Sequence, residues 1–147
     1  MKDLSLEFKS NLQKLFVEKK FSELEIEIEN LGKVQDLPDN IFYLYAITKS
    51  LNPSSNRNDL IQATEFLTQI YNKNKKNLEP LFNLVVVSLK AKKYKKTLKI
   101  LKEAFIENPK NEKIIDALAK FNHILANNEE AYKYYKLLFE INPNQIL

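Results

Sequence analysis

The feature that most constrains this chain is an internal repeat. An Asn-Pro pair at 108–109 recurs at 142–143, a shift of 34 residues (142 − 108). The same shift superposes large apolar positions: Leu81 on Ile115, Leu84 on Leu118, and Leu101 on Tyr135. A fixed period of this length is typical of arrays in which one supersecondary unit recurs and packs against its neighbours.

The apolar spacing predicts helices along the chain. The segment 23–29, ELEIEIE, alternates as a strand would, yet Leu24 and Ile28 also keep helical spacing. A lone strand among helices would have no strand to pair with, so we predict a helix here. A single glycine in the chain, Gly32, argues against a β architecture with many turns. The prediction is an all-α fold.

Helix ends are indicated by capping residues and prolines. Asp39, Asn58 and Asn111 are candidate N-caps, because their side chains accept hydrogen bonds from first-turn amides. Pro80 fits a first helical turn, where its missing N–H costs nothing.

At this spacing the chain resembles the tetratricopeptide repeat (TPR) family, whose unit is a helix–turn–helix of this length. Two repeats, 78–111 and 112–145, match the family pattern best, through Leu81, Leu84, Tyr94, Leu101, Ala104 and Pro109, and through Ile115, Leu118, Ala119, Ala131, Tyr135 and Pro143. Two others, about 5–38 and 39–77, are degenerate, and repeat 78–111 departs from the pattern at Thr97. The resemblance implies one domain over 1–147, a right-handed superhelical solenoid of antiparallel helix pairs.

The resemblance also implies a concave groove, lined by the first helix of each repeat, that receives a peptide or a partner helix. Its register gives these candidate groove residues: Lys9, Gln13, Tyr43, Leu44, Ile47, Phe82, Asn83, Val86, Leu89 and Lys120. The family's clamp for a terminal carboxylate is expected to be absent, because only Lys9 and Asn83 fit it. The alternative, that these side chains simply pack neighbouring first helices together, stays open at this point.

Charge is concentrated in the middle of the chain. Residues 41–110 hold 13 basic and 5 acidic residues, a net charge of +8. The candidate basic patch is Lys92, Lys93, Lys95, Lys96 and Lys99. The register buries Tyr94, the aromatic residue of this tract, so a nucleic-acid surface is not favoured. The patch is either a solvated turn or a site for an acidic partner. The acids of 23–29 are interpreted as a solvated face.

No sequence signature of catalysis is found. The chain has no Cys and a single His, His123, and it lacks phosphate-binding and nucleophile motifs. We therefore expect no enzyme, no cofactor and no metal. Apolar runs are too short for a membrane span, and the N-terminus lacks a signal-peptide pattern, so we expect a cytoplasmic protein.

The expected function is a protein–protein interaction module whose partner is a protein or peptide. Residues 128–141 are apolar on several sides, so we expect either a homodimer through this helix or a longer polypeptide. Two alternative functions stay open: an N-terminal recognition arm of a larger bacterial enzyme such as a transferase, and a basic nucleic-acid-associated protein.

Overall fold

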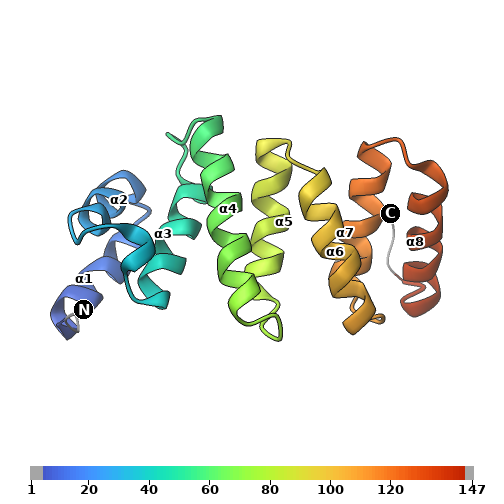
Figure 1. Cartoon of the computed structure of the whole chain (residues 1–147), viewed down its shortest axis with the longest axis horizontal. Coiled ribbons are helices and arrows are strands. Elements are labelled where there is room, and N and C mark those ends of the chain that lie inside the picture. The colour runs from blue at the N-terminus through green and yellow to red at the C-terminus, as the bar shows by residue number, and fades with distance from the viewer. Residues whose placement is uncertain (1–4, 145–147) are drawn as a thin grey trace. The chain divides into compact units, whose positions relative to one another are not determined.

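The regular structure of this chain is helical. A computed structural model describes residues 5–144, and no strand occurs among them. The helices are α1 (Leu6–Val17), α2 (Phe21–Glu29), a 3-10 helix (Val34–Asp36), α3 (Asp39–Leu51), α4 (Arg57–Lys73), α5 (Glu79–Ala91), α6 (Lys95–Glu107), α7 (Glu112–Ile124) and α8 (Asn128–Ile141) (Figure 1). The all-α prediction is confirmed. The segment ELEIEIE lies within α2 and is a helix, as its apolar spacing predicted.

The chain divides into two compact units, one ending at Asn83 and the other beginning at Leu84. In the first unit α1 packs on α2, α2 on α3, and α3 on α4. In the second unit α6 packs on α7, and α7 on α8. In these two series, α1 to α4 and α6 to α8, each helix therefore packs against the next along the chain.

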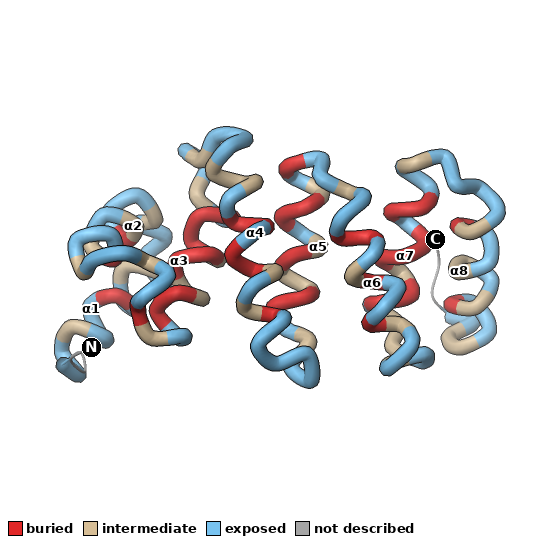
Figure 2. The backbone as a smooth tube through the Cα atoms, viewed as in Figure 1, coloured by how far each residue is buried: buried red, intermediate tan, exposed pale blue. Residues whose placement is uncertain are grey.

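The core of the first unit lies between its helices. Its buried apolar side chains are Leu12, Leu24, Ile28, Leu37, Ile41, Phe42, Tyr45, Ala46, Ala63, Phe66, Leu67, Tyr71 and Leu81. The rings of Phe42 and Phe66 lie 5.0 Å apart between α3 and α4. Ala46 and Ala63 are fully buried, and their small size lets these two helices approach closely. Buried backbone accordingly concentrates where neighbouring helices face each other (Figure 2).

The core of the second unit is built around α7. That helix buries Ile114, Ile115, Ala117, Leu118, Ala119, Phe121 and Asn122. A helix that is apolar on most sides belongs between others, and α7 packs on both α6 and α8. The ring of Tyr94, just before α6, meets Phe121 edge-on at 5.8 Å. Phe105 of α6 meets Tyr134 of α8 in the same way at 5.6 Å.

Helix starts follow local hydrogen-bonding rules, and the caps predicted from the sequence are right for α7 but wrong for α3 and α4. Asn56, not Asn58, caps α4: its side chain accepts from the Asp59 amide while the Asp59 carboxylate accepts from the Asn56 amide, a capping box. Asn111 caps α7 as predicted. Asp39 is the first residue of α3 and Pro38 takes the N-cap position. The cap of α4 was assigned to the wrong residue because the polar run before this helix contains several side chains that could accept the hydrogen bond.

Buried polar side chains in the second unit are paired. Ser88 and Thr97 share a 2.7 Å hydrogen bond that joins α5 to α6. Asn122 donates to the Leu118 carbonyl at 2.8 Å and accepts from Asn127 at 3.1 Å. A buried polar group costs stability unless it is hydrogen-bonded. Thr97, which departs from the repeat pattern, is thus explained by its partner Ser88.

We expect Leu118→Ala to lower the free energy of unfolding by about 2–5 kcal/mol, since it leaves a cavity in the core of the second unit. Leu118 is fully buried on α7. Chemical denaturation measures the change. Ile106→Ala is the matched control, because Ile106 is 74% exposed and its truncation leaves no cavity. Equal losses in the two variants would contradict this description of the core.

Candidate functional site

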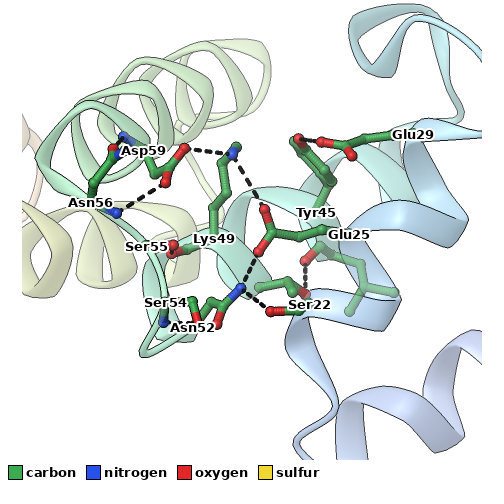
Figure 3. A network of polar contacts seen from close by, with 12 residues as sticks. Ser22, Glu25, Glu29, Tyr45, Lys49, Asn52, Ser54, Ser55, Asn56 and Asp59 are labelled. Carbon is green, nitrogen blue, oxygen red and sulfur yellow. Dashed lines mark hydrogen bonds and ion pairs between the residues drawn. The ribbon is translucent and has the colours of Figure 1, made fainter.

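The densest polar cluster in the described residues surrounds Lys49, on α3 (Figure 3). Lys49 is 6% exposed, and its ammonium group lies 3.2 Å from Glu25 of α2 and 3.1 Å from Asp59 of α4. Its Nζ also lies 5.4 Å from the centre of the Tyr45 ring. One cation therefore ties three helices of the first unit together.

Three further hydrogen bonds extend this cluster toward α2. Asn52 donates hydrogen bonds to Glu25 and, at 3.3 Å, to Ser22. Tyr45 donates from its hydroxyl to Glu29 at 2.6 Å. Glu25 and Glu29 of α2 thus face α3 and the loop that follows it, and their contacts join the first two helix pairs.

The electrostatics of the cluster favour its charged state. Burial lowers the pKa of Lys49, but hydrogen bonds and attraction from Asp59 and Glu25 outweigh burial, and the net pKa is raised. The pKa of Asp59 is lowered, first by the Asn56 amide and then by Lys49. A lysine held protonated is a poor nucleophile or base. This centre therefore stabilises the fold and has no feature of a reactive site.

The interpretation of residues 23–29 as a solvated acidic face is wrong for Glu25, whose side chain is 12% exposed and pairs with the buried Lys49. Glu25 and Glu29 are spaced i, i+4 and so lie on one helix face, where they bind Lys49 and Tyr45. Glu23 lies on another face and is exposed. The spacing alone could not identify this pair, because Glu23 and Glu27 are also separated by four residues.

Two of the candidate groove residues of the first unit contact each other. The Tyr43 hydroxyl on α3 donates to Glu79 of α5 at 2.9 Å and accepts from the Asn83 amide at 2.6 Å. Burial, and then the hydrogen bond to Glu79, raise the pKa of Tyr43. Tyr43 and Asn83 thus connect the first helices of two successive pairs, which is the packing role that the sequence left open.

The other candidate groove residues of the first unit are less engaged. Leu44 and Ile47 lie half-buried on α3, and Phe82 lies half-buried on α5. Lys9 and Gln13 are exposed on α1. Gln13 borders an open depression formed by Ser10, Lys14, Val17 and Glu18.

The second unit carries the remaining candidate groove residues. Val86 is 50% exposed on α5, whereas Leu89 is half-buried. Lys120 is exposed on α7 and forms an ion pair with Asp116 at 2.8 Å. Whether any of these residues contacts a ligand stays a prediction.

The lysines of the candidate basic patch all lie on the surface of the second unit. Lys92 and Lys93 are in the turn after α5, while Lys95, Lys96 and Lys99 begin α6, and all five are exposed. Tyr94 is half-buried against Phe121, close to the burial that the register predicted.

The other predicted features are placed as follows. His123 is exposed near the end of α7. On α8, Tyr132 and Phe139 are 68% and 59% exposed, and their seven-residue spacing puts them on one helix face. Dimerisation through this helix stays a prediction.

Neither a metal site nor a membrane span is found in residues 5–144. Within that range no three His, Cys, Asp or Glu side chains are grouped closely enough to hold a metal ion. None of the helices described there has the length and apolarity needed to cross a bilayer.

Comparison with known proteins gives similarity in structure alone. No protein-family model matches the chain, and no curated protein matches it. The solved structure of MamA MSR-1 C2 matches with a TM-score of 0.68 and 16% identity, covering 94% of this chain and 76% of that one. A MamA point mutant matches with a TM-score of 0.72 and 15% identity, covering 95% of this chain and 74% of that one. MamA is a TPR-like helical-repeat protein, so the predicted fold class is confirmed.

We expect Lys49→Met to lower the free energy of unfolding at neutral pH by about 2–3 kcal/mol. Removing one partner of a fully buried ion pair costs about 3–5 kcal/mol, and the partial exposure of Asp59 reduces that. The matched control is Lys73→Met, because the Lys73–Asp39 pair is largely exposed and such pairs contribute about 0–1 kcal/mol.

The difference in the free energy of unfolding between wild type and Lys49→Met is expected to depend on pH. The lowered pKa of Asp59 means that its contribution is lost as pH falls below the ordinary Asp value of about 4. The raised pKa of Lys49 means that its contribution is lost as pH rises beyond the ordinary Lys value of about 10.4. The difference between wild type and Lys49→Met is therefore largest at neutral pH and shrinks at both extremes. A difference that did not change with pH would contradict the ion pairing.

Ultraviolet titration of tyrosine tests the hydroxyl contacts. Burial, followed by the hydrogen bond to Glu29, raises the pKa of Tyr45. Burial and the hydrogen bond to Glu79 raise the pKa of Tyr43 in the same way. Ordinary tyrosines ionise near about pH 10. We expect Tyr45→Phe and Tyr43→Phe each to remove an absorbance change that occurs at higher pH than this. Loss of the signal near that ordinary value would contradict the contacts.

Proposed function

We propose that this chain is a protein-interaction module that binds a peptide segment or a partner helix along the first helices of its helix pairs. The observation that carries the proposal is the surface of α3. Leu44 and Ile47 lie there half-buried, whereas Ile41, Phe42 and Tyr45 of the same helix are buried. Incompletely buried aliphatic side chains beside polar groups are the usual composition of a helix-binding or peptide-binding surface.

The polar groups beside these side chains support the same function. Tyr43 already connects Glu79 and Asn83, so its ring and hydroxyl are held in a fixed position. A preorganised aromatic side chain loses little conformational entropy on binding. The TPR-like fold shared with MamA is consistent with an interaction module, and the partner is to be found by experiment.

The alternatives drawn from the sequence remain predictions. A recognition arm of a larger enzyme and a nucleic-acid-associated protein are each compatible with an all-α fold. No separate observation in residues 5–144 favours either over a peptide-binding module.

A peptide-display experiment tests the proposal. Peptides selected from a random library against the wild-type chain are expected to bind Leu44→Gln/Ile47→Gln at least about tenfold more weakly, because the aliphatic contacts are lost. The matched control is Val17→Gln/Ile106→Gln, which replaces two side chains that are 72% and 74% exposed on other helices. Thermal unfolding confirms that each variant is folded. Equal binding by wild type and Leu44→Gln/Ile47→Gln would overturn the proposal.

A further inference from the structure

The second unit carries a cluster of exposed lysines that form no ion pairs with other described residues. It consists of Lys92, Lys93, Lys95, Lys96, Lys99 and Lys102, hereafter the α6 lysine surface, and all six side chains are exposed. None of the ion pairs found in residues 5–144 involves these six. Lysines elsewhere in that range do pair, for example Lys73 with Asp39 and Lys120 with Asp116.

The positive charge of this surface is unfavourable at the N-terminal end of α6, the helix that carries most of these lysines. The N-terminal end of an α-helix is partially positive and favours acidic residues. The other α-helices of the described chain have an acid in the first turn, such as Glu79 in α5 and Glu112 in α7. In α6 the first turn has no acid and holds Lys95 and Lys96. These lysines therefore do not stabilise their own helix.

The lysines are presented on a rigid support. The turn is closed by the Lys93 amide, which donates to the Ser88 carbonyl at 3.0 Å, and Lys92 takes a left-handed conformation at φ 56°. Behind it, the buried Ser88–Thr97 hydrogen bond joins α5 to α6, and Tyr94 packs edge-on against Phe121. A charged surface fixed in this way loses little freedom when it binds.

The chemistry of the surface indicates one class of partner. Nucleic-acid surfaces read bases by stacking on exposed aromatic or arginine side chains, whereas here Tyr94 is turned inward and every cation is a lysine. Helices that bind membranes insert large apolar side chains. The exposed large apolar side chain of α6 is Ile106, which lies at the C-terminal end of the helix, away from the lysine-bearing turn. An ammonium group is a compact point charge that a single carboxylate oxygen can meet without a fork of arginine donors or an aromatic ring, so charge complementarity favours an Asp- or Glu-rich segment.

We propose that the α6 lysine surface binds an acidic polypeptide segment. Lys95 to Lys102 spans about 10 Å of helix at 1.5 Å per residue, and the preceding turn extends the surface. An extended chain at about 3.3 Å per residue covers this length with about four to six residues. The ligand is accordingly a short run of Asp and Glu. This surface belongs to the second unit and does not depend on the proposed function of Leu44 and Ile47 in the first.

Fluorescence anisotropy with a labelled hexaglutamate peptide tests the proposal, with hexaglutamine as the uncharged reference. Wild type is expected to bind hexaglutamate at low salt, with affinity falling as salt screens the exposed charges. Lys95→Gln/Lys96→Gln/Lys99→Gln is expected to bind at least about tenfold more weakly. It should unfold at the same or a higher temperature, because cations leave the N-terminal end of α6. Weaker binding would then not reflect unfolding.

The matched control removes the same charge elsewhere. Lys14→Gln/Lys75→Gln/Lys76→Gln neutralises three exposed lysines outside the surface, and less than a twofold change is expected. Equal loss in both triple variants would assign binding to net charge alone and overturn the proposal, as would absence of hexaglutamate binding at low salt.

Two competing ligands complete the test. Uridine RNA, or vesicles of phosphatidylcholine and phosphatidylserine, that bound more tightly than hexaglutamate and required the same three lysines would overturn the assignment to an acidic polypeptide. Leu44→Gln/Ile47→Gln is expected to keep wild-type affinity for hexaglutamate, so failure of one proposal is distinguishable from failure of the other.

Discussion

Every helix here depends on its neighbour to cover its apolar side. A helical hairpin of this length cannot bury its own apolar face, so within each unit neighbouring helices must pack on one another. The requirement is clearest in α7, where seven residues are buried, including Ile114, Leu118 and Phe121. Such a helix is stable only with a neighbour on either side, and α6 and α8 supply them. The succession of helices within each unit follows from this one constraint.

Polar side chains then determine how particular helices meet. Apolar burial is non-directional and tolerates sliding of one helix on another, whereas a buried charge must meet its partners in one arrangement. Lys49 reaches Glu25 and Asp59 together only when α2, α3 and α4 are correctly placed. The buried hydrogen bond between Ser88 and Thr97 specifies the contact of α5 with α6 in the same way, with uncharged side chains. These contacts limit the alternatives that a repetitive apolar core would otherwise permit.

The fold class could be read from the sequence because it rests on periodicity. The apolar stripes predicted helices, and Pro80 lies in the first turn of α5 as its missing N–H predicted. The polar contacts could not be read in this way. Lys49 and Glu25 are 24 residues apart, and nothing in either segment identifies the other as its partner. Asn56 rather than Asn58 is the cap of α4, because the Asp59 carboxylate accepts a hydrogen bond from the Asn56 amide and completes the capping box. Tyr43 was assigned to a groove by register, but its hydrogen bonds join residues up to 40 positions apart.

The division between packing and recognition follows from the same constraint. Neighbours cover one face of each helix, and side chains on the remaining face need not serve the core. On α3 that remaining face keeps Leu44 and Ile47 half-buried, while on α6 it holds lysines that oppose the helix dipole. Neither choice is explained by the stability of the fold. An aliphatic surface suits an apolar or amphipathic segment and a lysine surface suits an acidic one, which is why we propose a chemically different partner segment for each.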